Sequence, residues 1–156
     1  MKLKTNKQVY GKYFTPYDIN PVNSHASDCS IRALGYLSGL SWKTIYNLLF
    51  KIGKNMYNMP NSFEVLNRII KTAGGKKCRN IRSPFKMKIF EVVQLSEKTQ
   101  LTYIVFVYQH VLIVSKGKVI DRHIGNFDAG IDYYFSIPEK IDLKKITEDI
   151  CQKQNI

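Results

Sequence analysis

Hydrophobic residues in the first half of the chain recur every three to four positions, which is the spacing of one helix face. The stretches begin after residue types that are common at helix starts, namely Asp28, Ser41 and Asn61. Each is followed by glycine that can end a helix, at Gly39, Gly53 and the Gly74-Gly75 pair. A weaker helical pattern spans residues 86–95. The first half is therefore predicted to be helical.

The pattern changes after residue 100 to short runs of β-branched and aromatic residues, which are typical of strands. The predicted strands cover residues 101–107, 110–114, 118–123 and 131–137. Between the second and the third of them, Lys116-Gly117 predicts a hairpin turn. Apolar positions at helical spacing predict a closing helix within residues 139–156. The expected architecture is α+β, with a helical N-terminal half packed on an antiparallel sheet from the C-terminal half.

One domain is expected to span residues 1–156, because the chain has no internal repeat and no linker rich in proline, glycine or serine. Residues 1–20 show no clear period and are expected to form an irregular arm or an edge strand. With 44% hydrophobic residues, including eight Phe and ten Tyr, the chain can build a core without a metal or a disulfide.

The three cysteines, Cys29, Cys78 and Cys151, lie far apart and without CxxC spacing, which argues against a disulfide framework or a structural zinc site. The basic N-terminal stretch is followed by no apolar signal segment, and no later run reaches the roughly 18 apolar residues of a membrane span. We therefore expect a cytoplasmic protein without membrane contact and without a metal or organic cofactor.

Cys29 is placed in the first turn of a predicted helix, where free N–H groups and the helix dipole stabilise a thiolate. A turn at Lys116-Gly117 sets residue 112 opposite Asp121, so that His110 and Asp121 become diagonal neighbours on one face of the hairpin. A carboxylate there can orient the imidazole of a general base. The sequence thus predicts a triad of nucleophile, base and orienting acid.

Other assignments stay open on the same residues. His123 would face His110 and is a rival base, while Asp128 and Asp132 are rival acids beyond the hairpin. A single cysteine on an amphipathic helix is more often a small core residue, and this interpretation would be preferred for Cys29 if it were considered without His110 and Asp121. The presence of a cysteine, a histidine and an aspartate together at these positions favours the catalytic interpretation.

Two segments carry a further pattern, SDCSIRALGYLSGLSWKTIYNLL (27–49) and QHVLIVSKGKVIDRHIG (109–125). The first has an Asp-Cys pair that opens a helix with an Arg-Ala step, then a link with Gly, Ser and Trp to a second helix. The second has a His-Val strand, a Gly turn and an Asp. Residues 23–125 thereby resemble the papain-like cysteine peptidases, and in particular the small single-domain members found in phages and mobile elements.

The resemblance implies Cys29 as nucleophile, His110 as base and Asp121 as orienting acid. It also implies an oxyanion hole formed by the Cys29 backbone N–H and the side chain of Asn23, which replaces the family's longer Gln and has Ser24 and His25 as neighbours that could substitute. The implied activity is a peptidase or isopeptidase that acts on proteins or peptides through a thioester, in the host cytoplasm if phage-encoded. The same triad also serves transglutaminases, deamidases and acyltransferases.

Basic charge is the remaining compositional feature, with 24 Lys and Arg against 12 Asp and Glu and a net charge of +12. Residues 68–88 hold eight basic and no acidic residues around Cys78, which is expected to be a loop thiol. The candidate partner-binding residues there are Lys76, Lys77, Arg79 and Arg82. They could hold an acidic protein or a nucleic acid, or form a solvated face.

Two alternative functions follow from these readings. The chain could be a basic nucleic-acid- or protein-binding module in which Cys29 is a core residue, or an inactive papain-like domain that keeps the fold for binding. The sequence has no RNP-type aromatic strand, zinc-finger spacing, P-loop or GxGxxG motif, so no familiar nucleic-acid or nucleotide module is indicated.

Overall fold

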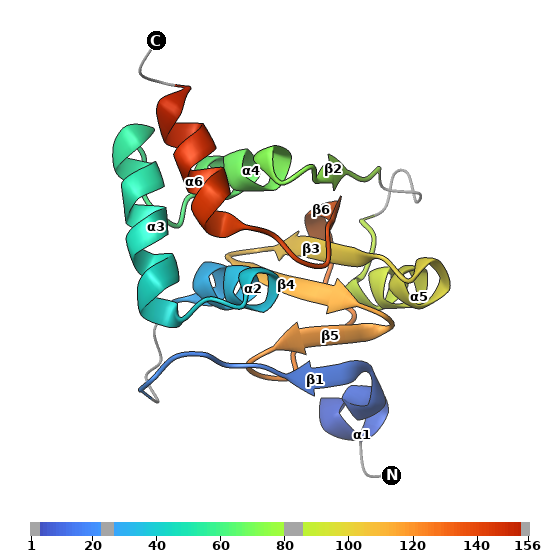
Figure 1. Ribbon diagram of the computed structural model, residues 1–156. Helices are drawn as coiled ribbons and strands as arrows, with labels where there is room; N and C mark the ends of the chain where they lie inside the picture. Colours follow the sequence, from blue (N-terminus) through green and yellow to red (C-terminus); the bar gives the residue numbers. More distant parts are fainter. Residues whose placement is uncertain (1–3, 23–26, 80–85, 154–156) are drawn as a thin grey trace.

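The computed structural model describes residues 4–22, 27–79 and 86–153. A six-stranded sheet runs through the molecule in the order β1-β5-β4-β3-β6-β2 (Figure 1). The strands are β1 (Phe14–Pro16), β2 (Lys76–Lys77), β3 (Thr102–Val107), β4 (His110–Ser115), β5 (Lys118–Asp121) and β6 (Ile131–Ile137). The pairs that involve β2, β3, β4 and β6 are antiparallel, whereas β1 lies parallel to β5 at one edge. The sheet is therefore mixed and open.

Helices cover both faces of this sheet. They are α1 (Asn6–Tyr10), α2 (Cys29–Ser38), α3 (Trp42–Asn55), α4 (Phe63–Thr72), α5 (Ile89–Thr99) and α6 (Leu143–Gln152), with a 3₁₀ turn at Gly11–Tyr13. Helices α2, α3, α4 and α6 share one hydrophobic cluster with one face of the sheet, and α5 packs against the other face. The mixed α+β class predicted from the sequence is confirmed.

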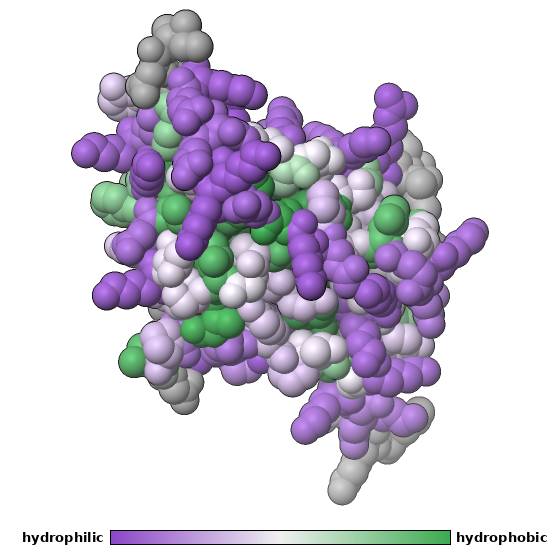
Figure 2. Space-filling view, viewed as in Figure 1, coloured by the Kyte–Doolittle hydropathy of each residue, from purple (hydrophilic) through white to green (hydrophobic). Residues whose placement is uncertain are grey.

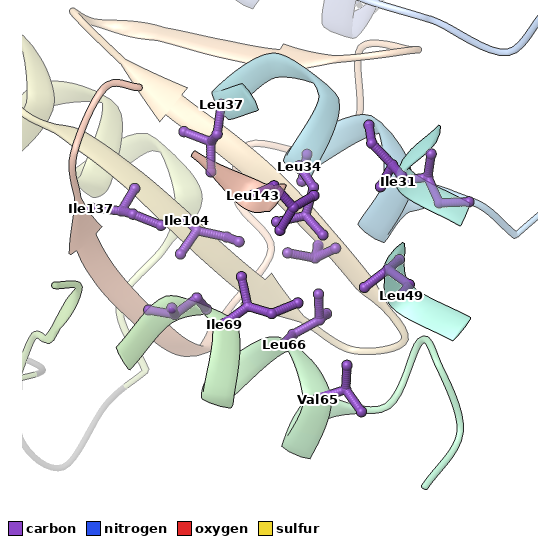
Figure 3. Close-up of a cluster of buried hydrophobic side chains, with 14 of the residues drawn as sticks. Ile31, Leu34, Leu37, Leu49, Val65, Leu66, Ile69, Ile104, Ile137 and Leu143 are labelled. Carbon is purple, nitrogen blue, oxygen red and sulfur yellow. The ribbon is translucent and has the colours of Figure 1, made fainter. Parts of the chain in front are cut away.

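Side chains of alternate residues in β3 enter different clusters because successive residues of a strand point to opposite faces. Ile104 and Phe106 join the cluster under α2, α3, α4 and α6, while Tyr103 and Val105 join the cluster under α5. Figure 3 shows Ile104 among side chains from α2, α4 and α6. Burial on both faces explains why residues 103–106, within the predicted strand 101–107, are all apolar or aromatic, whereas Leu101 lies outside β3 and is 49% exposed.

Hydrophilic side chains project around the rim of the molecule in the view of Figure 2, and hydrophobic side chains gather toward its middle. Within the described residues, no helix combines the length and the apolar character that crossing a bilayer requires.

Helix boundaries follow the predicted signals in part. Gly39 ends α2 with a left-handed φ of 68°, and the Ser41 hydroxyl accepts a hydrogen bond from the Thr44 N–H at the start of α3. The prediction for Gly53 is wrong, because α3 continues to Asn55. A Cβ atom at Gly53 would lie 2.8 Å from the Asn58 carbonyl oxygen, so this glycine permits a close backbone approach inside the helix.

Further corrections concern Asn61 and the sheet edges. The hydroxyl of Ser62, in place of Asn61, caps α4 by accepting from the Val65 N–H at 3.2 Å. The N-terminal arm supplies β1, as the edge-strand alternative predicted, but its pairing with β5 is parallel, so the sheet is not wholly antiparallel. Lys76–Lys77 pair with β6 at the opposite edge as β2, which no pattern in the sequence indicated.

Candidate active site

Cys29 is the first residue of α2 and is partly buried. The first backbone hydrogen bond of the helix runs from the Arg32 N–H to the Asp28 carbonyl, so the N–H groups of the preceding turn have no partner within the helix. The prediction that Asp28 caps α2 with its side chain is wrong, since that carboxylate makes no capping hydrogen bond. The N–H groups and dipole at this helix start are arranged to stabilise negative charge at Cys29.

The hairpin formed by β4 and β5 has the predicted register. Lys116 and Gly117 form the turn with positive φ values of 49° and 76°, as in a type I′ turn, and Ser115 pairs with Lys118. The same register pairs residue 113 with residue 120, which makes His110 and Asp121 diagonal neighbours. The two side chains meet in a hydrogen bond of 2.5 Å between His110 Nε2 and Asp121 Oδ2.

The helix start and the hairpin come together at the Cys29 thiol, because α2 packs against β4 (Figure 1). The Cys29 side chain is hydrogen-bonded to the His110 side chain and to the backbone N–H of Val111. Since Nε2 of His110 faces Asp121, Nδ1 is the ring nitrogen left for the sulfur. Cys29, His110 and Asp121 thus form one hydrogen-bonded series.

This series shifts the protonation of both reactive groups. Burial raises the pKa of the Cys29 thiol, but its hydrogen bonds to His110 and Val111 and the charges of His110 and Arg32 outweigh burial and lower that pKa. Hydrogen bonds to Asp121 and Cys29, opposed by burial, raise the pKa of His110 to about 9. Proton transfer from sulfur to imidazole is therefore favoured, and the result is a thiolate beside an imidazolium.

Arg32 links the two halves of the site. Its guanidinium donates to the Asp28 carboxylate and, at 3.4 Å, to Asp121 Oδ1, and all three side chains are largely buried. Burial raises the pKa of Asp121, but the hydrogen bond and charge of His110, the Arg122 backbone N–H and the charge of Arg32 outweigh it and lower that pKa. Asp121 is thus held as a carboxylate.

Asp28 is 4% exposed and has two further donors on its second oxygen. The Trp42 indole N–H and the Asn20 side-chain amide each donate to Oδ2 at 2.9 Å. A buried carboxylate needs such partners, and they explain why Asp28 turns away from the end of α2. Asn20, Arg32 and Trp42 are site residues that the sequence analysis did not identify.

The hydrogen bonds of Arg32 and Trp42 differ in how far the sequence could have predicted them. Asp28 and Arg32 are four positions apart on a helix, a spacing at which opposite charges meet, so their pairing was recoverable from the sequence. The Trp42 indole reaches Asp28 from the next helix, and nothing local in the sequence predicts that bond.

The residues predicted as rivals make contacts other than those the triad requires. His123 is exposed beyond the end of β5 and shares only a hollow with His110. Asp128 accepts a hydrogen bond from the Tyr10 hydroxyl at 3.2 Å, and Asp132 accepts from Lys86 at 2.6 Å. Among the described residues, neither carboxylate is hydrogen-bonded to His110, and Asp121 is.

Of the predicted oxyanion and partner-binding residues, Asn23, with its neighbours Ser24 and His25, and Arg82 lie outside the described residues. Lys76, Lys77 and Arg79 are exposed, at and just after β2. Cys78 lies between them, with its sulfur 3.6 Å from the Lys76 carbonyl oxygen, and Cys151 is partly buried in α6.

A hollow of about 390 Å³ opens at Cys29 and His110, so both groups can be reached from outside. Within the described parts of the chain, no three His, Cys, Asp or Glu side chains gather in a way that could hold a metal ion. The arrangement suits nucleophilic chemistry by a thiolate, with an imidazolium as proton donor. Comparisons of the chain with protein-family models, with curated proteins and with solved structures found no match.

Proposed function

We propose that the protein is a cysteine peptidase or isopeptidase with a papain-like arrangement of its site. The observation that carries this proposal is the hydrogen-bonded series Cys29, His110 and Asp121, which joins a helix start to a hairpin far along the chain. A structural cysteine needs neither a histidine partner nor a carboxylate behind that histidine. The lowered pKa of Cys29 and the raised pKa of His110 suit a nucleophile and a proton donor.

In the proposed reaction, the Cys29 thiolate attacks the carbonyl carbon of an amide and forms a C–S bond. The negative charge that develops on the carbonyl oxygen is stabilised by the Cys29 backbone N–H at the start of α2, with the Asn23 amide as the proposed second donor. When the C–N bond breaks, the leaving amine takes the proton of His110. Water, deprotonated by His110, then attacks the thioester and releases the acid and the Cys29 thiolate.

Asp121 has a supporting role in this scheme. It accepts from Nε2 of His110, so the ring presents Nδ1 to the sulfur throughout the cycle. Arg32 and the Arg122 N–H help to keep Asp121 ionised, and the ionised carboxylate stabilises the imidazolium. An acceptor other than water at the thioester step would make the same site an acyltransferase.

Alkylation by iodoacetamide tests the proposal without any knowledge of the substrate. At pH 6, Cys29 should react at least about tenfold faster than Cys78 and Cys151, because only a thiolate attacks the reagent. The rate at Cys29 should rise with pH through a lowered pKa and then level off at a lower pH than the rate of an ordinary thiol does. Mass spectrometry of peptides that contain each cysteine measures the three rates.

His110→Asn is the matched variant for this measurement. It removes the hydrogen bond and the positive charge that, against the effect of burial, lower the Cys29 pKa. The pH at which the alkylation rate of Cys29 rises should therefore be higher by at least about one unit in this variant. Equal rates at all three cysteines in the native chain, or no change in His110→Asn, would show that Cys29 is a structural thiol.

Turnover should follow a bell-shaped pH profile. On the acid side it rises as Cys29 loses its proton, and on the alkaline side it falls near pH 9 as His110 loses the proton that the leaving amine needs. The profile of kcat/KM on the best-cleaved member of a peptide mixture checks this expectation. An alkaline limb centred near the ordinary histidine value, about 6.5, would contradict the ion-pair description.

A further inference from the structure

The hollows around the candidate active site share lining residues with one another. The central hollow, at Cys29 and His110, shares Ser27, Ser30 and Asn61 with a hollow of about 310 Å³ beside α3. On its other side it shares Asp132 and Tyr133 with a hollow of about 850 Å³ beside β2. Each of these two hollows thus adjoins the central hollow through its own set of shared residues, and we call the three adjoining hollows the groove, with Cys29 in the central one.

Aromatic side chains line the end of the groove beside α3, which we call the apolar end. Trp42, Tyr46 and Phe50 follow one another at four-residue intervals on α3, with ring centroids 5.2 and 6.1 Å apart. Tyr46 is 45% exposed, Phe50 is 53% exposed and the neighbouring Met59 is 67% exposed. Aromatic and apolar surface of this kind gains free energy when a partner covers it.

The end beside β2, here the basic end, has the opposite character. Among the described residues, its charged lining consists of Lys77, Arg79 and Lys86 against the single carboxylate of Asp132. Lys86 pairs with Asp132 at 2.6 Å, and the Lys77 ammonium lies 4.6 Å from the centre of the Tyr133 ring. The basic end therefore keeps an excess of positive charge beside the central hollow.

We infer that the substrate is a protein segment that crosses Cys29 in extended form, with large apolar side chains on one side of the cleaved bond and acidic side chains on the other. This inference rests on the proposed function. It follows from the position of the thiol in a hollow that adjoins both an aromatic and a basic end, since an extended segment across Cys29 places the residues that flank its bond toward the adjoining hollows. Apolar contact and charge complementarity then select the sequence on each side.

A polyanion fits the same groove less well. The apolar end has Asp28 as its one charged lining residue among those described, so a phosphate backbone along the whole groove would meet no cation there. A peptide can change its chemistry from one side of the bond to the other, as the groove does. A peptide is for this reason the occupant that the lining favours.

Six internally quenched peptides of equal length test the inference. The first two place Phe and Leu on one side of the central bond and Glu and Asp on the other, in the two possible orders. Each order has a counterpart in which Ser replaces the apolar residues and another in which Lys replaces the acidic residues. One of the first two should be cleaved at least about tenfold faster than its Ser and Lys counterparts, the discrimination that about 1.4 kcal/mol supplies.

Matched variants assign the two preferences to the two ends. In Phe50→Ser, the peptide with Phe and Leu should lose most of the difference in cleavage rate that separates it from its Ser counterpart. Lys77→Glu should lower the cleavage rate of the acidic peptide and raise that of its Lys counterpart, each by about fivefold. Lys98→Glu is the control for charge, because Lys98 is exposed on α5, across the sheet from the central hollow. Thermal melts verify that each variant is folded.

The outcomes separate this inference from the proposed function. Selective alkylation of Cys29 together with equal cleavage of all peptides, or with cleavage of none, would overturn the substrate class and leave the proposed chemistry standing. Loss of selective alkylation would overturn both. Tight binding of a single-stranded oligonucleotide that weakens in Phe50→Ser and Lys77→Glu, with no peptide cleaved, would replace the peptide by a nucleic acid.

Discussion

Cys29→Ala should abolish peptide release, with a loss on the order of 10⁴-fold or more, while the protein stays folded. The thioester cannot form without the sulfur, and enzymes in which nucleophile and base act as a unit lose on the order of 10⁴ to 10⁶ in turnover when a member is removed. Fragment release from a mixture of unfolded peptides, followed by mass spectrometry, measures the effect. Cys78→Ala and Cys151→Ala are controls of the same chemical change and should keep full turnover.

The fold should tolerate this change. Cys29 is only partly buried, and its side chain lies at the border of the cluster beneath α2. Truncation there should change the free energy of unfolding by about 1 kcal/mol or less. A marked fall in melting temperature with unchanged turnover per folded molecule would instead identify Cys29 as a packing residue, and the proposed function would then be wrong.

The meeting of His110 with Asp121 was predictable because it depends on local features of the sequence. A two-residue turn at Lys116-Gly117 determines which residues of β4 and β5 face each other, and the alternation of side chains along each strand places His110 and Asp121 on the same face. The helix start at Cys29 is equally local, since Gly39 and the apolar spacing mark its extent. The catalytic roles of these residues remain predictions, which the alkylation rates test.

Features that depend on contacts between distant segments were not predictable in the same way. The parallel pairing of Phe14 with Val119 joins the arm to a strand about a hundred residues away, and periodicity within the arm says nothing of it. The close approach of Asn58 to Gly53 likewise depends on how the chain leaves α3. In the site, the same limit applies to Arg32, whose bond to Asp121 spans 89 positions.

Asp28 shows how the wrong local prediction and the distant contacts are related. An aspartate before a helix usually caps it, because an exposed carboxylate gains most from the free N–H groups. Here the carboxylate is buried beside Arg32, Trp42 and Asn20, and their hydrogen bonds outweigh the cap. As a result no described side chain caps the start of α2, whose N–H groups remain available at Cys29.

Removal of the Arg32 charge should therefore have the largest effect on stability among single changes in the site. Arg32→Met keeps much of the volume but leaves the Asp28 and Asp121 carboxylates buried without their shared cation. Loss of one partner from a buried ion pair costs about 3 to 5 kcal/mol, which for a chain of this size lowers the melting temperature by roughly 10 °C. Urea unfolding and thermal melts at pH 7.5 measure the loss.

The pH dependence and a matched variant distinguish this effect from a simple loss of packing. Lys116→Met removes a cation of the exposed pair with Glu139 and should cost much less than Arg32→Met, because solvent screens that pair. Burial raises the pKa of Asp121, while its hydrogen bond to His110 and the charge of Arg32 are among the influences that lower it overall, and Arg32→Met removes the second of these. The lowered pKa makes the contribution of Asp121 to stability present above its ordinary pKa of about 4 and lost as pH falls through the lowered one, so the cost of Arg32→Met should be full at pH 7.5 and shrink only below about pH 4. An equal cost above and below that range, or a cost no greater than that of Lys116→Met, would show that Arg32 stabilises the site by its packing and that its charge does not hold the two halves together.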